Sequence, residues 1–227
     1  TRKRIVHSGS TIEERLYLGN LERYRRWQGD TLREEIATHH LFADDQRVLL
    51  VEEVLQTDDT DLGRGTLYRY QYSNHLGSVG LELDAEAAII SYEEYHPYGT
   101  TAYQAKNATI RAKAKRYRYT GMERDEETGL SYHTARYYAP WLGRWTSSDP
   151  AAFQEGNNRF QYCRNRPVAR SDHGGKKSQS SEFIGLSSIN LESVYAEALR
   201  IADNELRFEV NQYNRQGELL AGSLEHV

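Results

Sequence analysis

The carboxylate with the clearest chemical context in this sequence is Asp149, which precedes Pro150 at the end of an aromatic stretch. That stretch, residues 129–150, reads GLSYHTARYYAPWLGRWTSSDP and holds two of the three tryptophans of the chain. An aspartate can act as an acid or a base when a second carboxylate shares its proton. An aspartate is also a common turn residue whose carboxylate caps backbone N–H groups. Asp149 is therefore either half of a catalytic pair or a turn residue, and Asp172 has the same two interpretations.

Two arginines in the same stretch could hold such a carboxylate. Arg136 and Arg144 carry guanidinium groups, which match the planar geometry of a carboxylate. Guanidinium groups also stack on aromatic rings, and Tyr137, Trp141 and Trp145 lie nearby in the sequence. We favour stacking for both arginines, with the clamping of a carboxylate as the alternative.

The composition favours β structure and excludes several classes of function. The chain has 227 residues, and its 17 tyrosines far outnumber its five phenylalanines. Tyrosine suits half-buried strand surfaces, where the ring packs and the hydroxyl reaches a partner. The net charge of −4 argues against a nucleic-acid-binding protein, and the single cysteine excludes an intrachain disulfide. No apolar run reaches the roughly 18 residues of a membrane span. The chain begins without methionine or an apolar signal core, so we expect a piece of a longer protein.

Alternating apolar residues, broken by turn signals, predict antiparallel strands in the first half of the chain. Gly19-Asn20 and Gln28-Gly29-Asp30 are typical of tight turns, and Arg47–Leu55 is the most apolar strand candidate. The three tyrosines of residues 68–72 (YRYQY) should share one face of a strand, because side chains alternate along it. Ile89–Tyr95 is predicted to return as another strand.

The remaining segments are less regular. Residues 104–116 are small and basic, which predicts a loop or a short helix, and residues 171–181 have the composition of a linker. Apolar residues from Leu191 to Ala202 follow helical spacing and predict an amphipathic helix. A hairpin over 206–220 would follow it. We therefore expect residues 176–227 to form a small α+β tail.

Four motifs in the middle of the chain follow one another in a recognisable order. They are YQYSNHLGSV (70–79), SYEEYHPYG (91–99), YRYTGMERDEETGLSYHTARYYAPWLGRWTSSDP (117–150) and NRFQYCRNRPV (158–168). Together they strongly resemble the Rhs repeat-associated core over residues 65 to 175, in the form found in insecticidal toxin-complex and SpvB-associated Rhs proteins. The residues that carry the core signature here are Tyr119, Gly121, Arg136, Tyr137, Tyr138, Trp141, Gly143, Arg144, Trp145 and Pro150.

The resemblance implies a mainly β fold, in which tyrosine-rich hairpin repeats form a strip that spirals into a hollow shell. Residues 1–64 would be upstream hairpin repeats, residues 65–175 the core, and residues 176–227 a linker and variable segment, which in this family is often a toxic effector. The implied partners are upstream repeats of the same polypeptide or complex, and the effector segment downstream. Such proteins are secreted or delivered at the cell surface as part of a larger protein. No cofactor is expected.

The same resemblance implies self-cleavage between shell and tail by two aspartates. The second aspartate of the family corresponds to Asp149, but the first position holds Ala139, which cannot carry a proton. The usual cleavage element reads RSDHGG at residues 170–175, where Asp172 remains and the usual proline and leucine do not. Asp149 with Asp172 is the catalytic pair left open, with a cut near Gly174–Lys176. The two departures favour a chain that does not cleave itself.

The other polar residues have structural interpretations. His39 and His40 are adjacent and should point to opposite faces of a strand, and the other histidines are dispersed, so we expect no metal site. Cys163 has no nucleophile context and is expected to be a small buried residue. The basic run Lys106–Arg118 is expected to be a solvated or shell-lining face rather than a phosphate site.

The preferred interpretation is a non-enzymatic structural module of a polymorphic or insecticidal-type toxin. It would form the C-terminal part of a β shell that encloses or presents the variable segment, with the aromatic residues of 129–150 packing its last hairpins. One alternative is an aspartyl-type autoprotease that releases the C-terminal segment. A second is a surface adhesion module whose tyrosine-rich and tryptophan-rich face binds glycans.

Overall fold

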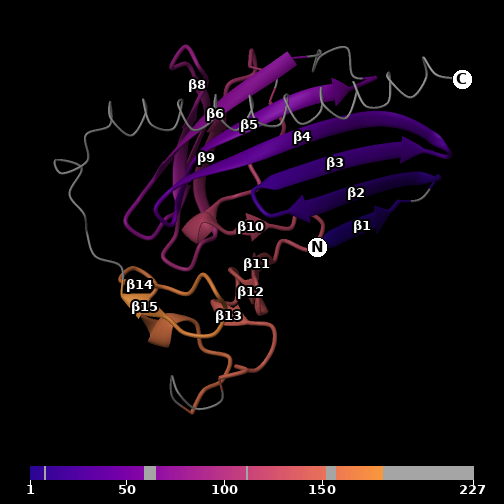
Figure 1. Ribbon diagram of the computed structural model, residues 1–227. Coiled ribbons are helices and arrows are strands. Elements are labelled where there is room, and N and C mark those ends of the chain that lie inside the picture. Colours follow the sequence, from indigo (N-terminus) through magenta and orange to yellow (C-terminus); the bar gives the residue numbers. More distant parts are fainter. Residues whose placement is uncertain (8, 59–64, 111, 152–156, 181–227) are drawn as a thin grey trace, which may run out of the picture.

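The computed structural model describes residues 1–7, 9–58, 65–110, 112–151 and 157–180, and nearly all of its regular structure is antiparallel β-sheet (Figure 1). The prediction of a mainly β chain is confirmed. The predicted amphipathic helix and C-terminal hairpin, and with them most of the α+β tail, lie outside the described residues.

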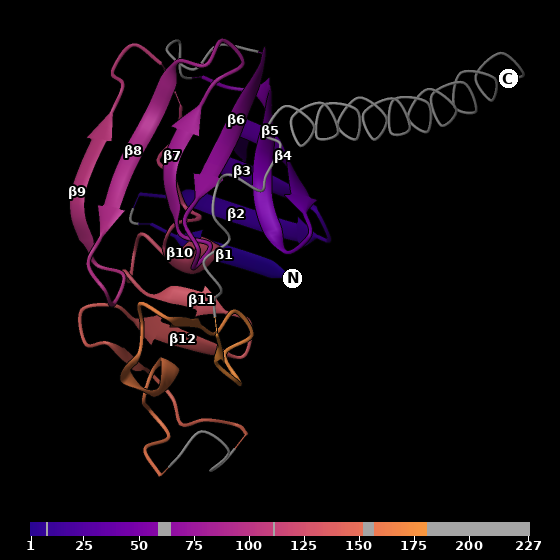
Figure 2. The same ribbon diagram turned by 90° about the vertical axis from the view of Figure 1, so that its left-hand side faces the viewer.

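A nine-stranded antiparallel sheet forms the larger part of the structure, and its strands are neighbours in strict chain order. They are β1 (Arg2–Val6), β2 (Thr11–Leu18), β3 (Leu21–Gln28), β4 (Thr31–Ala43), β5 (Gln46–Gln56), β6 (Gly65–Ser73), β7 (Val79–Leu83), β8 (Ile89–Tyr95) and β9 (Thr101–Lys106). The sheet is strongly twisted, so that β1–β3 cross the direction of β6–β9 (Figure 2). The predicted domain boundary between residues 64 and 65 falls inside this sheet, because β5 on one side of the boundary pairs with β6 on the other.

Tight turns set the register of the first hairpins. Gly19 and Gly29 adopt positive φ angles of 65° and 58°, which glycine tolerates without strain. They stand in the two-residue connections between β2 and β3 and between β3 and β4. The turns predicted at 19–20 and 28–30 and the strands predicted around them are therefore confirmed.

One face of the large sheet is apolar. Leu41, Leu49, Val51 and Tyr70 form a buried cluster, and Leu49 is fully buried. The register places Leu49 opposite Tyr70 and Val51 opposite Tyr68. The tyrosines at 68, 70 and 72 therefore share this apolar face, as strand alternation predicts.

The opposite face, which we call the polar face, buries charged side chains. Glu22, Glu34, Glu82 and Glu93 are each at most 4% exposed. Residues 112–118, which we call the strap, cross this face without forming a long strand or a helix. Its Lys115 is 4% exposed and binds Glu93, at a distance of 3.2 Å between Nζ and Oε2. The basic run was expected to be a solvated or shell-lining face. Solvation is wrong for Lys115, which is buried against a glutamate, and the shell-lining face stays a prediction.

Two small sheets complete the described structure and lie below one end of the large sheet in Figures 1 and 2. The first contains β10 (Glu123–Arg124), β11 (Ser131–His133), β12 (Arg136–Ala139) and β13 (Arg144–Trp145), and the second pairs β14 (Arg170–Ser171) with β15 (Gln179–Ser180). One short 3₁₀ turn, Tyr119–Gly121, precedes β10, and a second, Cys163–Asn165, lies between β13 and β14 in the chain.

An aromatic cluster packs the first small sheet against the two 3₁₀ turns. Its buried members are Tyr119, Tyr138, Trp145, Tyr162 and Cys163. The rings of Tyr138 and Tyr162 are stacked, with centroids 4.2 Å apart. Such pairs add about 0.5–1.5 kcal/mol each to the stabilisation that comes from buried area. Cys163 is 1% exposed, which confirms the expectation of a small buried residue.

Candidate functional site

Arg136 brings the two candidate aspartates together. Its side chain extends from β12 into the interior and is 3% exposed. Nη2 of Arg136 lies 3.1 Å from Oδ2 of Asp149 and 3.5 Å from Oδ2 of Asp172. Both aspartates are buried, at 5% and 1% exposure. We call Arg136 with Asp149, Asp172 and the Gly175 carbonyl the Arg136 clasp.

The guanidinium group of Arg136 also makes contacts on its other edges. Nε donates a hydrogen bond of 2.6 Å to the carbonyl oxygen of Gly175. The plane of the group lies over the Trp145 ring, 4.1 Å from the centroid. The two interpretations of this arginine, stacking and clamping, are therefore both realised. Arg144, by contrast, is exposed on β13.

Each aspartate also binds backbone N–H groups. Oδ1 of Asp149 accepts a 2.7 Å hydrogen bond from the N–H of Ala151, as expected for a turn residue. Oδ1 of Asp172 accepts hydrogen bonds from the N–H groups of Lys176 and Lys177, at 3.1 and 3.3 Å. The clasp thereby fixes residues 172–177 against the first small sheet, which contains β10–β13.

His133 completes the clasp from β11. Its Nδ1 lies 2.6 Å from the carbonyl oxygen of Asp172, and its ring packs edge-on against Trp145, with centroids 5.1 Å apart. Burial lowers the pKa of His133 to about 3, so the ring is neutral and Nδ1–H is the donor. A Cβ added to Gly175 would lie 2.5 Å from the carbonyl oxygen of His133, so only glycine fits there.

The geometry favours a structural role for these aspartates over a proton-sharing one. In an aspartyl-protease pair the two carboxylates share a proton directly. Here the same atom of Arg136, Nη2, forms an ion pair with Asp149 and with Asp172. Ala139, at the position of the family's first aspartate, is 2% exposed and ends β12, where it pairs with Arg144.

The other residues of the core signature divide between buried and exposed positions. Tyr119, Tyr138 and Trp145 lie in the aromatic cluster, as expected for a packing layer. Tyr137 and Trp141, however, are 44% and 54% exposed and do not belong to it. Alternation explains Tyr137, because its neighbour Tyr138 on β12 points inward.

The remaining members of the signature are turn residues. Gly121 and Gly143 adopt positive φ angles of 69° and 61°. A Cβ on Gly143 would lie 2.8 Å from the Tyr98 ring, so this position needs glycine. Pro150 is exposed next to Asp149.

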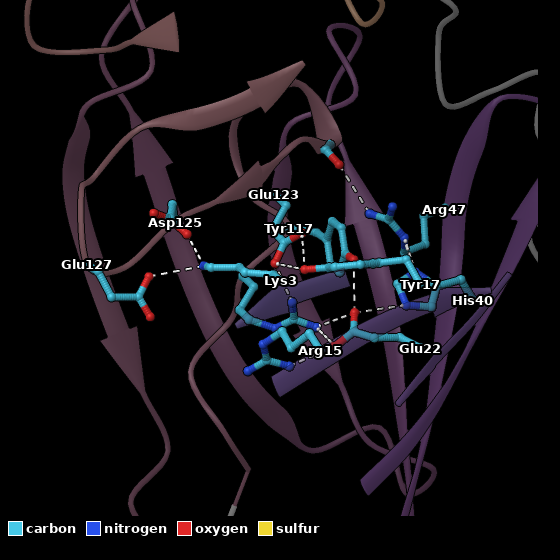
Figure 3. Close-up of polar contacts among 12 residues, drawn as sticks. Lys3, Arg15, Tyr17, Glu22, His40, Arg47, Tyr117, Glu123, Asp125 and Glu127 are labelled. Carbon is cyan, nitrogen blue, oxygen red and sulfur yellow. Dashed lines mark hydrogen bonds and ion pairs between the residues drawn. The ribbon is translucent and has the colours of Figure 1, made fainter. Parts of the chain in front are cut away.

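A second polar cluster joins the strap to the large sheet, and its centre is Glu22 (Figure 3). Nη2 of Arg116 lies 2.5 and 2.6 Å from the two carboxylate oxygens of Glu22, and Nη1 of Arg15 lies 2.7 Å from one of them. Burial by itself would raise the pKa of Glu22, but His40, Arg116 and Arg15 reverse this and hold the pKa well below its usual range. Glu22 is therefore ionised although its side chain is buried.

The same cluster reaches the small sheets through β10. Glu123 accepts hydrogen bonds from Nη1 of Arg116, at 2.5 Å, and from the hydroxyl of Tyr17, at 3.0 Å. Lys3 on β1 binds Asp125 and Glu127 in the following turn (Figure 3). The strap and the first two strands therefore position the small sheet that carries the Arg136 clasp.

Sequence reasoning missed His133, the strap and the role of Gly175. Gly175 adopts a positive φ of 62°, but a Gly-Gly pair in the sequence does not reveal which of its two glycines does so. For His133, alternation in SYHTARYY places it on the same face as Ser131, and both are buried. That pattern was the one available signal for a core histidine.

Neither a cluster of metal ligands nor a membrane-spanning helix occurs among the described residues. No group of three or more His, Cys, Asp or Glu side chains in this part of the chain could hold a metal ion. No helix within the same residues is long and apolar enough to cross a membrane.

Replacing Arg136 by alanine should lower the free energy of unfolding by about 3–5 kcal/mol, because two buried carboxylates would lose their cation. Arg144→Ala is the matched control on the neighbouring strand, and its effect should stay within about 0.5 kcal/mol, since Arg144 is exposed. Urea unfolding followed by circular dichroism measures both. Equal losses for the two variants would contradict the clasp.

Acidification should destabilise the protein through His133. The unfolded histidine takes up a proton below about pH 6.5, whereas the buried ring stays neutral down to about pH 3. Stability therefore falls as the pH drops through this window, by at most about 1.4 kcal/mol per pH unit from this group.

The control is His133→Asn, whose side-chain amide can still donate to the Asp172 carbonyl. Burial also lowers the pKa values of His40 and His173, so the wild type and the variant share those contributions. The slope of unfolding free energy against pH between 4 and 6 should be shallower in the variant. Identical slopes would show that His133 does not titrate as inferred.

Comparisons with known proteins place these features in a family. No family model matches the chain. Toxin subunit YenC1 of Yersinia entomophaga is 41% identical over 160 residues, which cover 70% of this chain and 16% of that protein. Toxin subunit YenC2 of the same organism is 47% identical over 107 residues, which cover 47% of this chain and 11% of that protein.

A solved structure agrees with these relatives. The crystal structure of TcdB2-TccC3 superposes on this chain with a TM-score of 0.71 and 38% identity, over 77% of this chain and 8% of the solved one. The chain thus spans well under a fifth of the length of the proteins it matches. The identities and the common fold show that it belongs to the Rhs family, in the form found in insecticidal toxin complexes.

Proposed function

We propose that this chain forms the C-terminal part of an Rhs shell that encloses or presents the segment following residue 180. Its relatives include toxin subunits, which supports a structural role for this chain in an Rhs-type toxin. The observation that carries the finer proposal is the Arg136 clasp, which anchors residues 172–177 to the small sheet just before that segment. The clasp would fix the point from which the enclosed chain departs.

The architecture of the large sheet supports the same proposal. Nine strands in chain order make a strip that can be extended by further hairpins at its edges. The strap covers part of the polar face of this strip, where a second sheet could otherwise pack. Ion pairs between its cations and the buried glutamates hold it there. Such a wall would partner with upstream repeats of the same polypeptide or complex, and with a toxic segment downstream. The larger protein would be secreted or delivered at a cell surface.

The test is protease accessibility of the C-terminal segment. Arg200, Arg207 and Arg215 supply trypsin sites there. In the longer protein with its upstream repeats, cleavage at these sites should be at least about tenfold slower than in the 227-residue chain alone, because the shell excludes the protease. Cleavage at the same rate in both would contradict enclosure, and mass spectrometry of the fragments distinguishes the cases.

Self-cleavage is a second candidate, favoured by one observation. The peptide bond between Gly175 and Lys176 has its carbonyl bound by Arg136 and its N–H bound by Asp172. Asp149 reaches the same guanidinium group. An autoprotease of this kind would cut near Gly174–Lys176.

Intact-mass spectrometry separates this candidate from the structural one. The structural proposal expects the purified chain to stay intact for days at mildly acidic pH. A cut near Gly174–Lys176 that disappears in Asp149→Asn would establish the autoprotease instead. The glycan-binding alternative rests on the exposed rings of Tyr132 and Tyr137, 5.2 Å apart, and an array without bound glycans would exclude it.

A further inference from the structure

The part of the chain from β11 to β15, residues 131–180, is basic, although the protein as a whole is acidic. It holds eight Lys and Arg against three Asp and Glu, a net charge of +5, whereas the whole chain has a net charge of −4. We call residues 131–180 the basic module, which lies below the large sheet in Figures 1 and 2. The acids that precede it are engaged by the large sheet and the strap, since Glu123 binds Arg116 and Asp125 binds Lys3.

The cations of the basic module lie at its surface, and its described acids do not. Asp149 and Asp172 are buried and form ion pairs with Arg136 in the clasp. The exposed charged side chains among the described residues of the module are all cationic, and they are Arg144, Arg164, Arg166, Lys176 and Lys177. The large sheet therefore leaves a positively charged surface uncovered.

Apolar side chains accompany these cations. Trp141 and Leu142, in the turn before Arg144, are 54% and 65% exposed. Phe160 is 43% exposed, and its carbonyl accepts a hydrogen bond from the N–H of Trp145, the neighbour of Arg144 on β13. The surface around Arg144 is thus both cationic and apolar. Such a surface suits a partner that is acidic and amphipathic.

The segment that follows the module in the sequence has both properties. Residues 181–227 hold eight Asp and Glu against three Arg, a net charge of −5. The apolar residues from Leu191 to Ala202 follow helical spacing, and Glu192 and Glu197 stand between them. The two adjoining parts of the chain therefore carry opposite charges of equal size.

The covalent connection makes a contact between these parts intramolecular. β15 ends at Ser180, and the clasp fixes the residues just before it, so the segment begins on the module itself. Surface ion pairs are individually weak. A short tether, however, raises the effective concentration of one partner around the other to about the millimolar range, so that several weak pairs suffice.

We propose that the exposed cationic surface of the basic module is the docking surface of residues 181–227 of the same chain. Acidic side chains of the segment would lie against Arg144 and Arg166. Its apolar residues would pack on Leu142 and Phe160. The contact would keep the downstream segment beside the clasp, and it needs no enclosing shell, because both partners belong to this chain.

Carbodiimide cross-linking of the full 227-residue chain, followed by mass spectrometry, tests this contact. The reagent joins a lysine amine to a carboxylate that touches it, and Lys176 and Lys177 are the only lysines of the module. At low salt we expect links from these lysines to acids between Glu192 and Glu218. In about 1 M NaCl the yield should fall by at least about threefold, because the Debye length shortens from about 10 Å at about 0.1 M to about 3 Å.

Two double variants make the result specific. Arg144→Glu with Arg166→Glu keeps both lysines and reverses two charges of the docking surface, so the yield at low salt should fall by at least about threefold. The matched control is Arg4→Glu with Arg33→Glu, at exposed arginines of the large sheet, and it should leave the yield unchanged. Circular dichroism checks that both variants are folded.

Three results would overturn the proposal. Equal yields in the two double variants would show that the tether alone accounts for the links. Links to Lys3 or Lys106 in place of Lys176 and Lys177 would assign the segment to the large sheet. A short duplex DNA that binds the wild-type chain but not the module variant would make nucleic acid the occupant, whereas we expect no binding, because the segment covers the surface. Enclosure is tested with the upstream repeats present, so the two proposals can fail separately.

Discussion

The structure depends on the ion pairs between the strap and the buried glutamates of the polar face. Removing a carboxylate from water costs several kcal/mol unless a cation and hydrogen bonds replace the lost hydration. Glu22 and Glu93 lie on strands far apart in the sheet, and Arg116 and Lys115 of one short strap neutralise them. The sheet and the strap therefore require each other. The same arginine, through Glu123, ties in the first small sheet.

The Arg136 clasp applies the same principle at the point where the described chain ends. The guanidinium of Arg136 binds two buried aspartates and the carbonyl of Gly175. The neutral ring of His133 donates a hydrogen bond to the carbonyl of Asp172. The arrangement accounts for the burial of Asp149 and Asp172, because each carboxylate forms an ion pair with Arg136.

Local patterns made the strands predictable, and long-range pairings were not. The alternation in YRYQY and the Gly-Asn and Gly-Asp turns are read within a few residues, so β5, β6, β8, the first tight turns and the shared face of the three tyrosines could be predicted. The contact between Arg116 and Glu22 spans 94 residues, and nothing in the basic run reveals it. Arg136 was identified as a candidate, but its neighbours Gly175 and His133 became evident only when the fold placed β11, β12 and residues 172–177 together. Tyr137 and Trp141 show the limit of composition, since Tyr137 is exposed by strand alternation and Trp141 by its place in the turn between β12 and β13.

A double-mutant cycle between Glu22 and Arg116 tests the central claim most directly. The free energy of unfolding would be measured in urea for the wild type, Glu22→Gln, Arg116→Gln and the double variant. We predict that each single change destabilises by about 3–5 kcal/mol. The double variant should lose at least about 2 kcal/mol less than the sum, because each single change leaves the other buried charge without this partner. Losses that add within about 0.5 kcal/mol would show that the strap and the sheet are not coupled through this pair, and would contradict the account.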